Sequence, residues 1–106
     1  MFDLAPLVGI SVNQDLRLDA AKARALSPVL WPVQPGRIFD AVVGGLESSE
    51  FKRQSRLIAQ TWQQAGAQTR YEEIAGTNHF TVIEALADPQ SAMSARVAQL
   101  AQQIKR

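Results

Sequence analysis

The only histidine of the chain, His79, stands in the stretch IAGTNHF, residues 74–80. Two acidic residues, Glu47 and Glu50, follow a short apolar run that ends in two glycines. A carboxylate that accepts a hydrogen bond from one imidazole nitrogen fixes the tautomer of the ring and leaves the other nitrogen free to take a proton from a nucleophile. These residue types therefore fit general acid–base chemistry, with His79 as the base and a nearby carboxylate to orient it.

Strand and helix patterns alternate around these residues. Residues 37–45 (RIFDAVVGG) form a short apolar run closed by glycines, which is typical of a buried strand. Residues 48–66 carry apolar side chains at helical spacing, with Ser48 or Ser49 as the N-cap and a glycine as the stop. Residues 68–76 (QTRYEEIAG) alternate in part and predict a second strand.

Two further helices are predicted after the second strand, a short one over residues 80–87 and a longer one over residues 89–105. The longer helix has an apolar stripe made of Val97, Leu100 and Ile104. Strands that alternate with helices predict an α/β fold with a parallel sheet. Active groups collect at the carboxyl ends of such strands. Glu47 follows the first strand and His79 the second, so we expect them to meet at one edge of the sheet.

The opening residues 1–36 differ from the rest of the chain, because they hold four of its five prolines and several broken apolar groups. We interpret them as connecting structure with short helices near Leu4–Val8 and Asp19–Leu26, the second capped by Asp19. Ser27 precedes a proline and should end that helix. Two strands are few for a stable sheet, so the pattern indicates the end of something larger.

Bulk composition excludes several function classes. The net charge is +1, so nothing favours nucleic acid or an anionic membrane as a partner. The chain has no cysteine, hence no disulfide or thiolate metal site, and one histidine with scattered carboxylates makes no metal-ligand cluster. No apolar run reaches the ~18 residues of a membrane span, and the start resembles no signal peptide. These features predict a soluble cytoplasmic protein.

Two stretches carry a resemblance to a known family. VVGGLESSEFKRQS (residues 42–55) and GTNHFTVIEAL (residues 76–86) resemble the C-terminal part of the arylformamidase (kynurenine formamidase) group of α/β-hydrolases, which are serine esterases and amidases. The opening MFDLAPLV and the stretch SVNQDLRLDAAKARALSP are also similar to that family. The resemblance implies a partial α/β-hydrolase fold, its C-terminal portion only. Residues 1–36 would then be a connecting, cap-like segment, and residues 37–106 would carry the triad acid and histidine.

The resemblance also implies roles for single residues. Glu47 matches the acid of a Ser–acid–His triad and His79 matches its histidine, while Glu50 is the alternative acid. Animal members usually have aspartate at the Glu47 position. Asn78 either shapes the turn before the histidine or faces the substrate, and Trp31 either packs or lines a substrate entrance. No cofactor or metal is implied.

The chain lacks the Gly-x-Ser-x-Gly elbow that holds the nucleophile in α/β-hydrolases. The resemblance therefore implies that the serine lies outside this chain, and that the chain alone is inactive. The expected substrate of the whole enzyme is a small ester or formamide. The expected partner is the N-terminal portion of the same fold, or a second copy through self-association. The alternative is a small, non-catalytic α/β binding or interaction module.

Overall fold

The structure is a computed structural model that describes residues 1–103. In chain order its elements are η1 (Ala5–Gly9), α1 (Asn13–Leu16), α2 (Ala20–Leu26), η2 (Pro28–Leu30), β1 (Ile38–Gly44), α3 (Ser49–Gln64), β2 (Gln68–Ile74), η3 (Glu84–Ala87) and α4 (Ala92–Gln102), where η denotes a 3-10 helix. Ile104, the last member of the predicted apolar stripe, lies outside the described residues.

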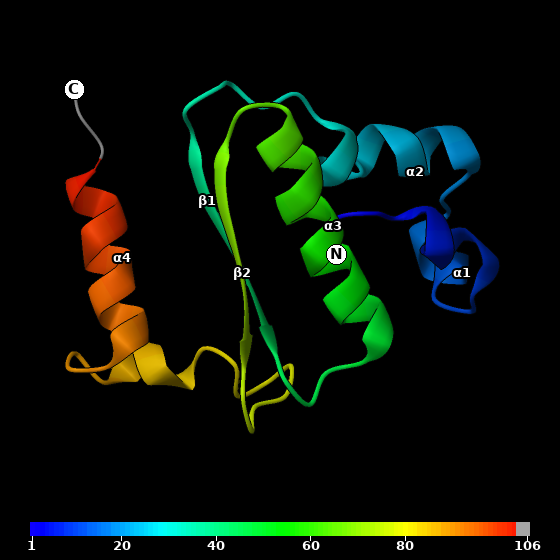
Figure 1. The fold of residues 1–106 in the computed structure, drawn as a ribbon. Coiled ribbons are helices and arrows are strands. Elements are labelled where there is room, and N and C mark those ends of the chain that lie inside the picture. Colours follow the sequence, from blue (N-terminus) through cyan, green and yellow to red (C-terminus); the bar gives the residue numbers. More distant parts are fainter. Residues whose placement is uncertain (104–106) are drawn as a thin grey trace.

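The two strands form a parallel pair, in register from Ile38 opposite Gln68 to Gly44 opposite Ile74. The predicted mixed α/β architecture with parallel strands is therefore confirmed. Figure 1 shows α3 on one side of the strands and α4 on the other. The carboxyl ends of both strands point to the lower edge in that view, where the segments that leave them lie together.

The core lies between the sheet and α3. It consists of Val29, Ala41, Ile58 and Ala59, with Phe2, Phe39, Leu57, Trp62 and Tyr71 packed against it. β1 supplies the buried side of the sheet through Ala41 and Val43, whereas β2 has no buried residue. This difference follows the sequences of the strands, since β1 is mainly apolar and β2 mainly polar.

The predicted N-cap is present at the start of α3. The Ser48 hydroxyl accepts a hydrogen bond from the Phe51 backbone N–H at 3.3 Å. Such a cap satisfies one of the N–H groups that a helix start leaves without a partner. The helix ends at Gln64, and Gly66 then takes a φ of 104°, a conformation that favours glycine. The loop that holds Glu47 is therefore joined to a well-defined helix start.

The N-terminal segment is fastened to α3 by a buried side chain. The Gln54 side-chain oxygen accepts hydrogen bonds from the backbone N–H groups of Phe2 and Asp3, at 2.8 and 3.0 Å. The predicted cap of α2 is also present, since Asp19 accepts from the Lys22 N–H. Burial of Gln54 is compatible with this role because its carbonyl oxygen is satisfied twice.

Two helical predictions need correction. Residues 80–83 form turns, and only Glu84–Ala87 is helical, as a 3-10 turn. The predicted last helix is shorter, because Ser91 caps it by accepting from the Ser94 N–H, and it runs from Ala92 to Gln102. The helix has no buried residue, and Val97 of its predicted apolar stripe is 52% exposed.

An ion pair links α4 to the outer face of the sheet. The Arg96 guanidinium donates two hydrogen bonds to the Asp40 carboxylate, at 2.7 and 2.9 Å. Arg96 holds the pKa of Asp40 below its ordinary value, because it favours the charged carboxylate. Beside this pair a hollow of about 470 Å³ separates the sheet from α4 and η3.

Among the described helices, none is long and apolar enough to cross a membrane.

Candidate active site

Glu47 and His79 lie in direct contact at the carboxyl edge of the sheet. The Nδ1 atom of His79 is 2.9 Å from Oε1 of Glu47, within hydrogen-bond distance. The Glu47 side chain is 5% exposed and that of His79 is 62% exposed. The carboxylate is thus enclosed and the imidazole is open to an incoming group. The structure brings together the two residues that the sequence placed at this edge, while their catalytic roles stay a prediction.

The second oxygen of the Glu47 carboxylate is held by the backbone. The Gly44 N–H donates to Oε2 at 2.6 Å, from the last residue of β1. A carboxylate that is bonded through both oxygens has little freedom to turn. Glu47 therefore presents Oε1 to the histidine in a fixed direction.

The loops that carry the two residues are joined by backbone hydrogen bonds. Gly45 N–H donates to the Ile74 carbonyl and Leu46 N–H donates to the Thr77 carbonyl, both at 2.9 Å. The Thr77 hydroxyl also donates to the Ile74 carbonyl, at 2.7 Å. These bonds extend the contact between the strands beyond their ends. The distance between Glu47 and His79 is thus set by main-chain contacts as well as by the side chains.

Gly44 allows these loops to approach closely. A Cβ atom at this position would lie 2.5 Å from the Thr77 carbonyl oxygen, closer than real Cβ contacts permit. The space is therefore available only because glycine has no side chain. The sequence pattern marks Gly44 only as the end of a strand, and no local signal indicates its part in the site.

Two aromatic rings contact the imidazole. The Phe51 ring stacks on it, with 5.1 Å between centroids and 26° between planes. The Phe80 ring meets it edge-on, at 5.6 Å and 80°. Within residues 1–103 no hydrogen bond engages Nε2 of His79. The arrangement is suited to proton transfer at Nε2, with Nδ1 directed to Glu47.

Glu50, the alternative acid, is committed elsewhere. Its carboxylate accepts hydrogen bonds from the side chains of Arg53 and Gln54. Arg53, with a smaller contribution from Gln54, lowers the pKa of Glu50 to about 2. The Gln54 side chain that donates to Glu50 also binds the backbone of the N-terminal segment. Glu50 therefore supports that segment and forms no hydrogen bond with the histidine. The geometry therefore favours Glu47 over Glu50 as the partner of His79.

Asn78 and Trp31, the other two candidates from the sequence, form hydrogen bonds with the backbone of the fold. The Asn78 side-chain oxygen accepts from the N–H groups of Phe80 and Thr81, at 2.8 and 3.0 Å, and so shapes the turn that carries His79. Trp31 donates its ring N–H to the Ala25 carbonyl at 3.0 Å. The structure records no contact between Trp31 and the Glu47–His79 pair.

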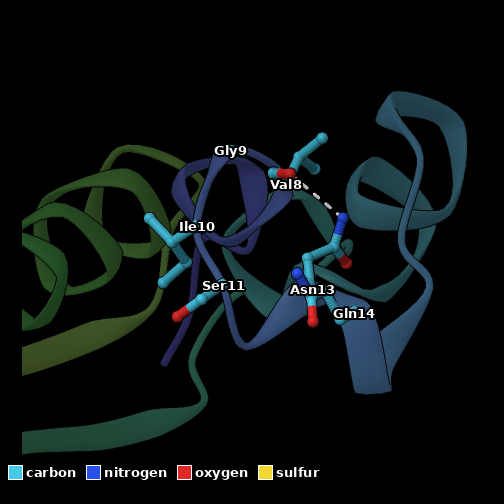
Figure 2. Close-up of a pocket in the computed structure, with 6 residues that line it drawn as sticks. All are labelled: Val8, Gly9, Ile10, Ser11, Asn13 and Gln14. Carbon is cyan, nitrogen blue, oxygen red and sulfur yellow. Dashed lines mark hydrogen bonds between the residues drawn. The ribbon is translucent and has the colours of Figure 1, made fainter.

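A second hollow lies in the N-terminal segment, lined by Val8, Gly9, Ile10, Ser11, Asn13 and Gln14 (Figure 2). The Asn13 side chain there donates to the carbonyls of Val8 and Leu18 and accepts from the Leu18 N–H, so its polar atoms serve the loop itself. In the part of the chain that the structure describes, no group of histidine, cysteine and acidic residues could hold a metal ion.

The chain is similar to known proteins both in sequence and in structure. No family model matches the sequence. The chain is 28% identical over 93 residues to kynurenine formamidase of Danio rerio, a match that covers 83% of this chain and 32% of that protein. It is 32% identical to a Silicibacter sp. TM1040 protein, provisionally described as a thioesterase, whose crystal structure matches 92% of this chain with a TM-score of 0.81.

The chain spans about a third of the length of both proteins, 32% of the first and 35% of the second. The sequence similarity and the structural similarity together support an α/β-hydrolase-like family. Both relatives are named for hydrolytic reactions.

Proposed function

We propose that this chain supplies the acid and the histidine of a Ser–acid–His triad in an esterase- or arylformamidase-like hydrolase. The observation that carries the proposal is the Glu47–His79 contact, with Nδ1 on the carboxylate and Nε2 free of hydrogen bonds from residues 1–103. The nucleophilic serine would lie outside residues 1–106, on a Gly-x-Ser-x-Gly elbow. The substrate class is a small acyl compound, namely an ester, thioester or formamide, in keeping with the names of the two relatives.

The expected chemistry divides into two half-reactions. The serine oxygen attacks the carbonyl carbon while Nε2 of His79 takes the hydroxyl proton. The bond to the leaving group then breaks, and His79 returns the proton to that group. Water attacks the acyl-enzyme in the second half, again with His79 as base and then as acid. Glu47 keeps Nδ1–H oriented and stabilises the imidazolium that forms in each half.

Exposed apolar side chains around the pair favour a covering segment. Leu46, Phe80 and Ile83 are 69%, 85% and 61% exposed. Groups of exposed apolar side chains of this kind often mark a site for a ligand or for another protein surface. The N-terminal portion of the same fold is the occupant we propose, and self-association is the alternative. The same observation would suit a non-catalytic interaction module, so activity must distinguish the two.

The purified 106-residue chain is expected to hydrolyse p-nitrophenyl acetate no faster than an equal concentration of free imidazole, because it lacks the nucleophile elbow. Addition of an upstream segment that carries the elbow is expected to restore turnover, and His79→Ala should abolish that gain. The measurement is the release of p-nitrophenolate. Turnover by the chain alone that disappears in His79→Ala would demand a nucleophile within the chain. Failure of every upstream segment to give turnover would favour the interaction module.

A further inference from the structure

The His79 ring is restrained in two directions. The hydrogen bond to Glu47 fixes the position of Nδ1 but permits the ring to rotate about the line that joins Nδ1 to Oε1. The stack on Phe51, at 5.1 Å and 26°, opposes that rotation because it fixes the plane itself. Such a second restraint is needed here, since the His79 side chain is 62% exposed and has few walls around it.

Both restraints come from one turn of the chain. Glu47 directly precedes the N-cap Ser48, and Phe51 donates its backbone N–H to the Ser48 hydroxyl. Gly44 fixes the Glu47 carboxylate from the strand side. The carboxylate and the aromatic face are therefore both positioned by the start of α3.

The packing of Phe51 differs from that of the other aromatic residues. Phe2, Phe39, Trp62 and Tyr71 pack against the hydrophobic core, whereas Phe51 is outside that group. Phe80 also contacts His79, but it meets the ring edge-on and is 85% exposed, so it provides little restraint. Phe51 instead stacks on the imidazole of His79.

We propose that Phe51 is a positioning residue for His79, which holds the plane of the imidazole so that Nδ1 meets Glu47 while Nε2 faces the approaching nucleophile. This inference rests on the proposed function, because it concerns the same histidine. It adds a residue whose effect on catalysis would pass through His79. A ring held in a single orientation meets the nucleophile without a search for the correct rotamer, which is the advantage of preorganised geometry.

The test uses the single histidine as a spectroscopic probe in the 106-residue chain. With ¹⁵N-labelled histidine, two-dimensional NMR reports the Nδ1 and Nε2 shifts, and hence the tautomer, from one set of signals. Phe51→Leu is expected to move the Nδ1 and Nε2 shifts toward those of free histidine. It should also move the ring protons downfield, because the aromatic ring current is lost. Phe51→Tyr keeps the ring and is expected to retain the shifts of the unaltered chain.

The matched control is Phe80→Leu, which removes the other aromatic neighbour and is expected to leave the tautomer unchanged. Phe51→Met, which keeps a long and adaptable apolar side chain without an aromatic face, is measured in parallel, and far-UV circular dichroism checks that each variant is folded. Unchanged nitrogen shifts in folded Phe51→Leu and Phe51→Met would overturn the inference. Glu47→Gln separates this failure from that of the proposed function. If Glu47→Gln alters the shifts, the pair stands and only the inference about Phe51 fails. If it does not, the pair itself is wrong.

Discussion

Glu47→Gln is expected to reduce kcat by roughly 10⁴-fold in the hydrolase that this chain would form with its nucleophile-bearing segment. Glutamine preserves the shape of the side chain, but it removes the negative charge and has one acceptor oxygen for two donors, the Gly44 N–H and Nδ1–H. When that oxygen accepts from Gly44, the amide nitrogen faces His79 and cannot accept from Nδ1–H. The histidine then loses both its preferred tautomer and the stabilisation of its charged form. The measurement is the turnover of a p-nitrophenyl ester at saturating substrate.

Glu50→Gln is the matched control for this experiment, because it makes the same chemical change at the same helix start. Glu50 is engaged by Arg53 and Gln54, and it has no contact with His79. We therefore expect kcat to remain close to that of the unaltered enzyme. Full activity in Glu47→Gln together with a large loss in Glu50→Gln would transfer the acid role to Glu50 and contradict the assignment.

Gly44→Ala is expected to destabilise the chain and separate the pair. The added methyl would lie 2.5 Å from the Thr77 carbonyl oxygen and 2.9 Å from its carbon, both of them backbone atoms that cannot rotate away. The loop that carries His79 must then shift. Overpacking of this kind typically costs about 1–3 kcal/mol. The measurements are the free energy of unfolding in denaturant and the histidine ¹⁵N shifts, which should resemble those of Glu47→Gln.

Gly9→Ala provides the comparison for that variant, since a Cβ at Gly9 meets nothing within 4 Å. Its free energy of unfolding should stay close to that of the unaltered chain. If Gly44→Ala and Gly9→Ala have equal stability and unchanged histidine shifts, the close approach of the two loops is not what holds the pair together.

The central elements were predictable because local and global signals agree there. The apolar run of β1, the Ser48 cap and the glycine after α3 each indicated the same strand–helix–strand order. A parallel pair then requires Glu47 and His79 to follow strand ends on one edge. The pattern could not decide between Glu47 and Glu50. That choice depends on how the first turn of α3 directs each side chain, and there Glu50 meets Arg53.

Other features depend on contacts that no local pattern records. α1 is organised by the Asn13 side chain, which bonds to Val8 and Leu18. The turn over residues 80–83 forms because Asn78 accepts two backbone N–H groups, an alternative to the predicted helix. Helical spacing marked Phe51 as an apolar helix residue, but its stack on His79 arises only when the two loops are joined.

The most direct measurement of the central claim is the rate at which a fluorophosphonate labels the serine of the hydrolase that contains this chain. The account predicts one labelled serine outside residues 1–106. It predicts a labelling rate that falls by roughly 10³-fold or more in His79→Ala, because activation of the serine requires the base. Peptide mapping by mass spectrometry locates the label, and Glu50→Gln serves as the control that should retain most of the rate, since Glu50 is engaged by Arg53 and Gln54. Labelling that is unaffected by His79→Ala, or a labelled serine within residues 1–106, would contradict the account.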